Sequence, residues 1–142
     1  MKMVAGDYKD AIGQSLAAWY TEKSGIQFYT VYTATGFLNA NGDIKAVAIF
    51  TDFTGANIEL HGVGPGAFTR RNIESVLNYV FNQLGCIRLT TKITRENKKI
   101  AKILIKLGFE YECTLKSYYG LHSSQDALVF RMFRQQAEKW IE

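Results

Sequence analysis

Apolar side chains near the start of the chain recur at helical spacing. Residues 7–23 place Tyr8, Ile12 and Leu16 four residues apart, and Gly25 follows shortly after. Spacings of three and four put such side chains on one face of a helix, and a glycine often ends it. The pattern therefore predicts an amphipathic helix over residues 7–23.

The next segment is rich in β-branched and aromatic residues and contains a turn signal. Residues 28–39 are dominated by Phe, Tyr, Thr and Val, residues 39–43 contain an Asn-Gly pair, and residues 44–53 are again mostly apolar. Asn-Gly between two such runs is a strong signal for a two-stranded hairpin. We expect two antiparallel strands here.

The rest of the chain alternates strand-like and helix-like patterns. The predicted elements are, in order, a strand at 56–63, a glycine-containing bend at 64–72, a helix at 73–84, a strand at 86–93, a helix at 98–107, strands at 109–119 and 126–133, and a helical segment at 134–142. An antiparallel front followed by a strand, helix, strand unit favours one mixed sheet with helices on its faces. The predicted fold class is α/β (α+β), in a single domain over residues 1–142.

Composition narrows the class of protein. Hydrophobic residues make up 47% of the 142 residues and charged residues 21%, as in ordinary globular proteins. No run approaches the roughly 20 apolar residues that a membrane span needs, so we expect a soluble, cytoplasmic protein without a membrane partner. Cys86 and Cys113 show no metal-ligand spacing with His61 or His122, which predicts reduced, structural thiols and no metal site.

Positive charge is concentrated in one part of the chain. The formal net charge is +4 and the isoelectric point is near 9.1. The segment from Arg88 to Lys106 contains seven basic residues and a single acidic residue, Glu96. On the helix at 98–107 the basic side chains form one stripe beside an apolar face; they are Lys98, Lys99, Lys102 and Lys106. Such a stripe is typical either of a solvated face or of a site for an anionic partner.

A glycine-rich bend precedes the second predicted helix. Gly62, Gly64 and Gly66 lie within five positions, and Arg70 and Arg71 follow at the start of the helix. Bare backbone amides beside a helix N-terminus can bind an anion. The segment is neither a P-loop nor a dinucleotide fingerprint, because the Gly-Lys-Ser/Thr and the third glycine are missing. A plain turn with two solvated arginines is the alternative.

The segment around the basic helix resembles a family motif. The GNAT acyl-CoA N-acyltransferases carry Asn-x2-Ala-x2-Leu-Tyr-x-Lys-x-Gly-Phe-x-x-Glu-Gly, and the chain is similar over about residues 45–140, most of all to small GNAT proteins of phages and prophages. The residues that align with the named positions of the motif are Asn97, Ile100, Ile103, Leu104, Lys106, Gly108, Phe109 and Glu112. Among the departures from the motif, Leu104 stands at the tyrosine and Cys113 at the last glycine.

The resemblance implies acetyl-CoA as cosubstrate and a site for it. The bend would cradle the pyrophosphate, Asn97 would bond the pantetheine arm or order the loop, and two lysines would meet the nucleotide phosphates. The arm would lie where the strand ending near Val63 splays from the strand beginning at Cys86. The implied cofactor contacts are Val63, Gly64, Gly66, Ala67, Thr69, Arg70, Arg71, Asn97, Lys102 and Lys106.

The resemblance also implies acetyl transfer to a primary amine by direct attack on the thioester. Glu59 and His61 alternate to one face of the predicted strand, and either can act as the base. Tyr118 is the candidate acid, because the usual tyrosine is replaced by Leu104. The acceptor stays open between a protein N-terminus, a lysine and a small molecule.

Two other functions remain possible from the residues. A protein that binds coenzyme A without catalysis fits the missing tyrosine and the altered glycine loop. A nucleic-acid-binding module fits the basic segment, but it is disfavoured because the helix that carries the stripe is otherwise apolar. The aromatic C-terminal strands also allow a homodimer.

Overall fold

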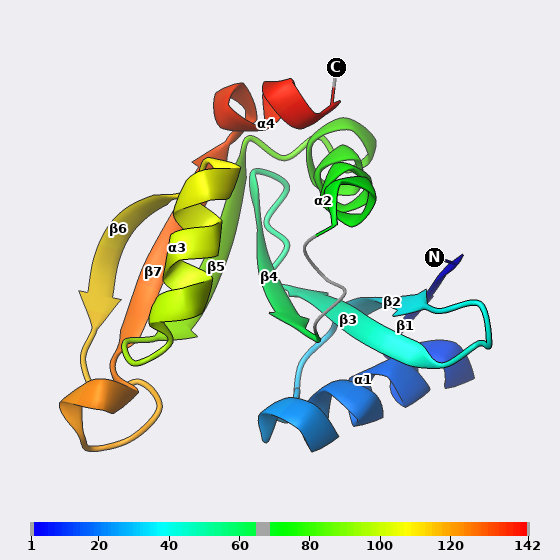
Figure 1. Ribbon diagram of the computed structural model, residues 1–142, viewed down its shortest axis with the longest axis horizontal. Helices are drawn as coiled ribbons and strands as arrows, with labels where there is room; N and C mark the ends of the chain where they lie inside the picture. The colour runs from blue at the N-terminus through cyan, green and yellow to red at the C-terminus, as the bar shows by residue number, and fades with distance from the viewer. Residues whose placement is uncertain (1, 65–68, 142) are drawn as a thin grey trace.

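The computed structural model describes residues 2–64 and 69–141. Seven strands form one sheet, and helices lie on both of its faces (Figure 1). The elements are β1 (Lys2–Asp7), α1 (Ala11–Ser24), β2 (Thr33–Leu38), β3 (Ile44–Thr51), β4 (Asn57–Val63), α2 (Arg70–Leu77), the π-helix η1 (Asn78–Gln83), β5 (Arg88–Thr94), α3 (Lys98–Leu107), β6 (Glu110–Leu115), the short helix η2 (Ser123–Gln125), β7 (Ala127–Phe133) and α4 (Arg134–Ile141).

The sheet is mixed, as the sequence predicts. Its strand order is β1-β2-β3-β4-β5-β7-β6. The β4–β5 pair is parallel and the other five pairs are antiparallel. The antiparallel front and the central strand, helix, strand unit are therefore confirmed, and so is the α/β class. No helix in the described part of the chain is long and apolar enough to cross a bilayer.

Two apolar clusters hold the helices against the sheet. One packs α2, α3 and α4 onto one face, around fully buried side chains such as Phe81, Leu89 and Met132. The other packs α1 onto the opposite face, around Leu16 and Ile49. The contacts of α1 with the sheet are mainly with β1 to β4.

The two parallel strands diverge in the middle of the sheet. Their register runs from Asn57 opposite Arg88 to Leu60 opposite Thr91 and then stops, although both strands continue. Figure 1 shows β4 and β5 spreading apart toward their arrowheads. The splay expected between the strand ending near Val63 and the strand after Cys86 is confirmed.

The N-terminal prediction is wrong in one respect, because a strand precedes the first helix. Six register pairs join β1 to β2, and α1 begins only at Ala11. Asp10 caps this helix, since its side chain accepts a hydrogen bond from the Gly13 amide at 2.7 Å. The pairing of β1 depends on a strand some thirty residues away, which local periodicity does not register.

Other boundaries also differ from the sequence patterns. The first hairpin strand starts at Thr33, not at residue 28, and β6 ends at Leu115, so that Tyr118 lies in the loop before β7. The helix predicted at 73–84 begins at Arg70 and continues after Leu77 as a π-helix.

Candidate active site between the diverging strands

A buried carboxylate lies on the face of β4 toward α1. Glu59 is only 6% exposed, and its two oxygens meet different partners. Oε1 accepts a hydrogen bond from Lys92 Nζ of β5 at 2.7 Å, and Oε2 lies 3.3 Å from His61 Nε2. One carboxylate thus connects the two strands just where their backbone pairing ends. The prediction that Glu59 and His61 share a face is confirmed.

The imidazole of His61 has a second polar neighbour on β3. His61 Nε2 lies 2.8 Å from the Thr51 hydroxyl oxygen, and that hydroxyl donates to Asp52 Oδ2 at 3.0 Å. Asp52 has a φ of 56°, a left-handed conformation that residues other than glycine seldom adopt. This backbone turn directs the carboxylate of Asp52 back to Thr51.

Burial and charge set the protonation of this cluster. Burial lowers the pKa of His61 from its usual 6.5, an effect that Lys92 reinforces and that Glu59 and Asp52 oppose. Burial also lowers the pKa of Lys92, but the hydrogen bond and the charge of Glu59 outweigh it and raise that pKa overall. At neutral pH the cluster therefore holds a neutral imidazole beside an ammonium–carboxylate pair.

Aromatic side chains surround the cluster from two sides. Phe28 lies with its ring centroid 4.9 Å from that of His61 and 5.3 Å from that of Tyr20 on α1. From the loop before β7, Tyr118 brings its hydroxyl to 3.5 Å from Lys92 Nζ and stacks at right angles on Tyr119. Burial, followed by nearby charges, raises the pKa of Tyr20 to about 12. The structure thus brings Tyr118 to the same cluster as Glu59.

An apolar cavity lies on the other face of the diverging strands, between α2 and α3. Its volume is about 70 Å³, and its walls come from both helices and both strands. They include Leu60 and Gly62 of β4, Leu89 of β5, Ile73, Val76 and Leu77 of α2, and Leu104 and Leu107 of α3. Leu104 thus presents a hydrocarbon side chain where the family motif has a tyrosine.

The glycine bend is partly described. Gly64 has a φ of 115°, and a Cβ there would lie 2.4 Å from the carbonyl oxygen of Lys45, so only glycine fits. A Cβ at Gly62 would meet open space, which leaves its backbone uncovered. Val63 ends β4 directly before this turn. Gly66 and Ala67, both predicted cofactor contacts, lie outside the described residues.

The predicted arginines stand in the first turn of α2. Thr69 caps this helix by accepting a hydrogen bond from the Asn72 amide at 3.2 Å. Arg70 is exposed, pairs with Glu74 at 2.9 Å and lies 5.1 Å above the Trp140 ring of α4. Arg71 is exposed as well.

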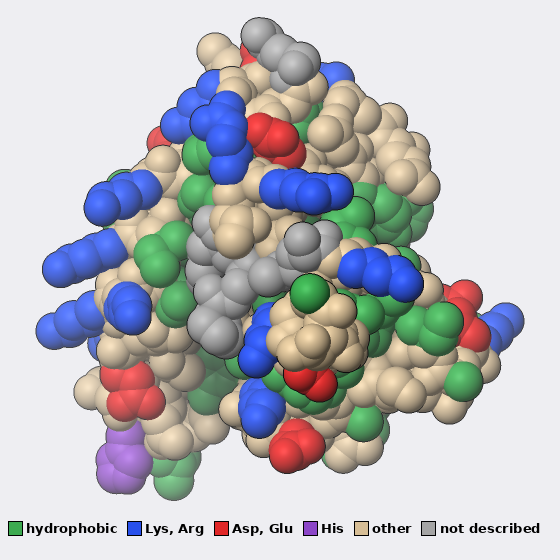
Figure 2. Space-filling view, turned by 45° about the vertical axis from the view of Figure 1, so that its right-hand side comes forward, with side chains coloured by type: hydrophobic (Ala, Val, Ile, Leu, Met, Phe, Trp, Pro, Cys, Tyr) green, Lys and Arg blue, Asp and Glu red, His purple; other side chains and the backbone are tan. Residues whose placement is uncertain are grey.

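The predicted contacts on α3 begin with its cap. The Asn97 side-chain oxygen accepts a hydrogen bond from the Ile100 amide, and Lys102 and Lys106 are exposed one turn apart. Figure 2 shows Lys and Arg side chains gathered over one part of this face of the molecule. The structure brings Asn97, the α3 lysines and the α2 arginines to the face of the sheet that α2 and α3 cover. Together they form a basic surface beside the apolar cavity, and such a surface attracts anions.

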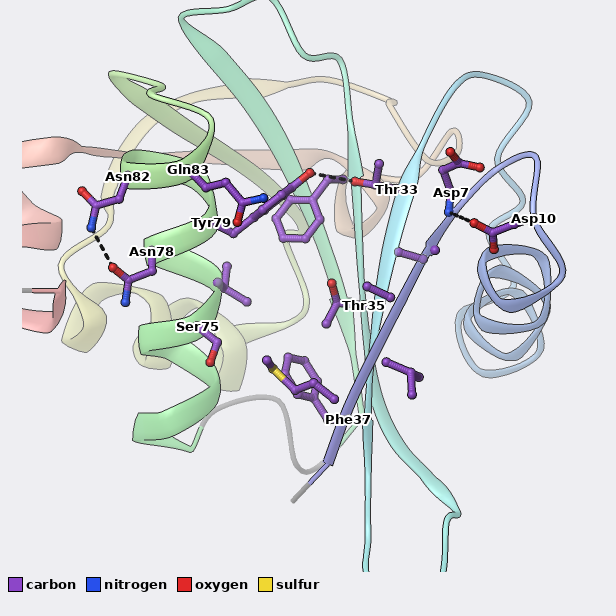
Figure 3. Close-up of a pocket in the computed structure, with 17 residues that line it drawn as sticks. Asp7, Asp10, Thr33, Thr35, Phe37, Ser75, Asn78, Tyr79, Asn82 and Gln83 are labelled. Carbon is purple, nitrogen blue, oxygen red and sulfur yellow. Dashed lines mark hydrogen bonds between the residues drawn. The ribbon is translucent and has the colours of Figure 1, made fainter.

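A groove larger than this cavity lies elsewhere on the described residues. It measures about 1020 Å³ and separates the β1–β2 edge from α2 and η1 (Figure 3). Its polar rim carries Thr33, Thr35, Ser75, Asn78, Asn82 and Gln83. Its two carboxylates, Asp7 and Asp10, accept hydrogen bonds from backbone amides. No His, Lys or Arg is among the described residues that line it.

Comparison with known proteins gives matches by structure but none by sequence. No protein-family model and no curated protein matches the chain. Solved structures of the spermidine N-acetyltransferase SpeG from Vibrio cholerae do match. A mutant form of the spermidine/spermine N-acetyltransferase has a TM-score of 0.75 at 12% identity, covering 99% of this chain and 100% of that chain. Another mutant has a TM-score of 0.75 at 14% identity, with 100% and 98% covered.

The chain has the GNAT fold. A dodecameric form of the same Vibrio cholerae enzyme has a TM-score of 0.73 at 12% identity, covering 96% of this chain and 95% of that chain. The match to GNAT structures over the whole chain confirms the fold that the sequence motif implied. These structures lend no support to the narrower resemblance to phage proteins.

Two site residues were missed by sequence reasoning. Lys92 was counted among the basic residues of the segment after Arg88, and Thr51 was part of an apolar strand. The missing signal was the parallel register: Glu59 lies opposite Thr90, so Lys92, two residues on, shares its face.

Proposed function

We propose that the protein is an N-acetyltransferase that moves the acetyl group of acetyl-CoA to a primary amine. One observation carries this proposal: the parallel strands of a GNAT fold diverge, with an apolar cavity on one face and the buried Glu59–His61–Lys92 cluster on the other. A thioester in the gap meets polar groups that can handle a proton, while the carrier's phosphates face the basic surface.

Each group has a role in the proposed reaction. The pantetheine arm lies along β4, where Gly62 leaves the backbone open, and the amide near Val63 faces the thioester oxygen. The pyrophosphate lies at the bend and the N-terminus of α2, beside Arg70 and Arg71.

The acid–base groups stand on the other side of the gap. Glu59 or His61 takes a proton from the acceptor, and the Tyr118 hydroxyl gives one to the departing thiolate. Because the thiolate is a good leaving group, we expect the acid to contribute less to the rate than the base.

The acceptor is proposed only as a class. The structural neighbours are described as spermidine or spermidine/spermine N-acetyltransferases, which makes an aliphatic amine the first acceptor to test. The aromatic rings of Phe28, Tyr20 and Tyr119 suit the hydrocarbon part of such a molecule. A lysine side chain and a protein N-terminus are the next acceptors in the panel.

The test is release of free thiol from acetyl-CoA in the presence of spermidine, short diamines, a lysine peptide and an N-terminal peptide. We expect amine-dependent thiol release with one of them, reduced at least a hundredfold in a variant with both Glu59→Gln and His61→Gln. Lys23→Gln, on the exposed surface of α1, is the control and keeps the wild-type rate. Thiol release that does not depend on any amine, or that persists in the double variant, contradicts the proposal.

A protein that binds coenzyme A without catalysis is the second candidate. The buried Leu104 favours it, because a leucine in the cavity wall cannot donate a proton. Under this reading acetyl-CoA binds, but no member of the amine panel accelerates thiol release.

Self-association is part of the proposal. The edge strand β6 exposes most of its residues, and an uncovered edge can pair with another chain. One SpeG structure is described as dodecameric. Sedimentation of the purified protein measures the mass directly, and a monomer at micromolar concentration contradicts this part.

A further inference from the structure

The hydrogen bonds around His61 decide which of its ring nitrogens carries the proton. A threonine hydroxyl has one hydrogen to donate, and Thr51 gives it to Asp52 Oδ2 at 3.0 Å. Toward His61 Nε2, 2.8 Å away, the same oxygen can only accept. The proton of this short contact therefore belongs to Nε2.

The second neighbour of Nε2 leads to the same assignment. Glu59 Oε2 lies 3.3 Å from it, and a carboxylate oxygen only accepts. The other oxygen, Oε1, is held by Lys92 at 2.7 Å, so the carboxylate is fixed in position. A lone pair on Nε2 would face two acceptors and be repelled by both.

We propose that Thr51 is a positioning residue which, together with Glu59, holds His61 as the Nε2–H tautomer, so that Nδ1 is the atom that takes the proton from the acceptor amine. The inference rests on the proposed function and selects His61 over Glu59 as the base. Within the described residues Nδ1 makes no hydrogen bond, whereas both oxygens of Glu59 are engaged.

In the proposed step, one proton leaves the amine before it attacks. Nδ1 takes one proton from the acceptor's ammonium group, which frees the nitrogen lone pair to attack the thioester carbon. The new C–N bond forms and the C–S bond breaks. The Tyr118 hydroxyl gives its proton to the thiolate and takes up the second proton of the amine in its place, the third stays on the amide, and the imidazolium returns its proton to solvent.

Charged groups from three strands set the basicity of the ring. Asp52 on the β3 side and Glu59 of β4 favour the imidazolium, while Lys92 of β5 opposes it. The Phe28 ring packs against the imidazole edge and adds no charge, and burial is the largest effect. The net result is a ring that is neutral, and thus able to accept a proton, at neutral pH.

The direct test is the ¹⁵N spectrum of the imidazole rings in the free protein. The chain has only two histidines, so His61→Gln assigns both signals, and the exposed His122 serves as an internal reference. We expect a protonated-type shift for Nε2 of His61 and an unprotonated-type shift for Nδ1 at pH 7. An Nδ1–H ring or an imidazolium at this pH overturns the inference while leaving the proposed function intact.

Variants at Thr51 connect the tautomer to the reaction. Thr51→Val removes the oxygen at nearly constant volume, and we expect a mixture of tautomers and a kcat about tenfold lower with an unchanged KM for acetyl-CoA. Thr51→Ser keeps the hydroxyl and both wild-type values, which separates positioning from packing.

If Thr51→Val has the kcat and the tautomer of the wild type, Thr51 does not position His61. If His61→Gln has the wild-type rate, Nδ1 is not the base. If Thr51→Val does not fold, the wild-type spectrum and His61→Gln still decide the assignment. A wild-type protein that acetylates no amine refutes the proposed function and, with it, the base, whatever the tautomer.

Discussion

At the scale of single residues, the ion pair between Glu59 and Lys92 is the most consequential contact. Both side chains are largely buried, and removing one partner leaves the other charge without water or a counterion. Lys92→Met should lower the free energy of unfolding by about 3 kcal/mol, measured by urea denaturation at pH 7.

The matched control removes both charges. Glu59→Gln combined with Lys92→Met leaves no lone buried charge, and we expect it to regain more than half of the lost stability. A single variant as stable as the wild type, or a double variant less stable than the single one, contradicts a buried pair at this place.

The lowered pKa of His61 predicts how the free energy of unfolding changes with pH. Because burial lowers the pKa in the folded state, the unfolded chain binds the proton first as the pH falls below 6.5. His61 therefore costs stability progressively between pH 6.5 and its lowered folded value. Its contribution is absent above this window.

The measurement is urea denaturation of the wild type and His61→Gln at pH 7.5 and pH 5. We expect the stability difference between them to shift in favour of the variant at the lower pH, since glutamine takes up no proton. An unchanged difference at the two pH values contradicts the burial of a neutral imidazole.

Sequence reasoning at this scale found groups on one strand and missed the groups that complete them. Glu59 and His61 were accessible because alternation within a strand is local. Lys92 and Thr51 join them only through the registers of β4 with β5 and with β3, in which Glu59 lies opposite Thr90 and Thr51. These registers are properties of the folded sheet.

At the scale of elements, the N-terminus of α3 combines two functions that substitutions can separate. The side-chain oxygen of Asn97 caps the helix. The GNAT resemblance implies that Asn97 also bonds the pantetheine arm or orders the loop, and for the first of these roles we propose its amide NH2 as the donor. Asn97→Ala should cost about 1 kcal/mol of stability and weaken acetyl-CoA binding.

Asn97→Asp is the control, because it retains the capping oxygen and loses the donor. We expect wild-type thermal stability with binding weakened about tenfold, an amount worth about 1.4 kcal/mol. If Asn97→Asp binds acetyl-CoA as well as the wild type does, Asn97 acts as a cap alone.

Elements with local signals were predictable and those with distant partners were not. The Asn-Gly hairpin and the helix between Asn97 and Gly108 appear where the sequence places them, since turn and cap residues act within a few positions. The strand β1 was missed, because only its pairing with β2 makes it a strand. The π-helix after Leu77 likewise reflects packing, with Val80 and Phe81 buried.

At the scale of the whole molecule, the basic stripe of α3 lies on the side of the sheet opposite α1. The α3 stripe ends in Lys102 and Lys106, which we propose as contacts of the nucleotide phosphates. Reversing both, as Lys102→Glu with Lys106→Glu, should weaken acetyl-CoA binding about tenfold at low salt, and less at high salt because exposed charges are screened.

The control makes the same change of net charge on the other face. Lys9→Glu with Lys23→Glu alters exposed residues before and at the end of α1, which packs on the opposite side of the sheet. We expect no more than a twofold change in affinity. Equal losses in the two double variants indicate general charge attraction and not a site on α3.

The overall architecture was the most predictable feature, since the order of helices and strands and one motif between Asn97 and Glu112 sufficed for the fold. The cofactor residues were assigned by that resemblance alone. The cavity between α2 and α3 supports them, because it adjoins the open backbone at Gly62.

The central claim is that the gap between β4 and β5 is a site for acetyl-CoA, and calorimetric titration of the protein with acetyl-CoA tests it most directly. We predict saturable binding of one molecule per chain with a micromolar dissociation constant, competed by coenzyme A. No heat of binding at high micromolar concentration, with the protein folded by circular dichroism, would contradict the account.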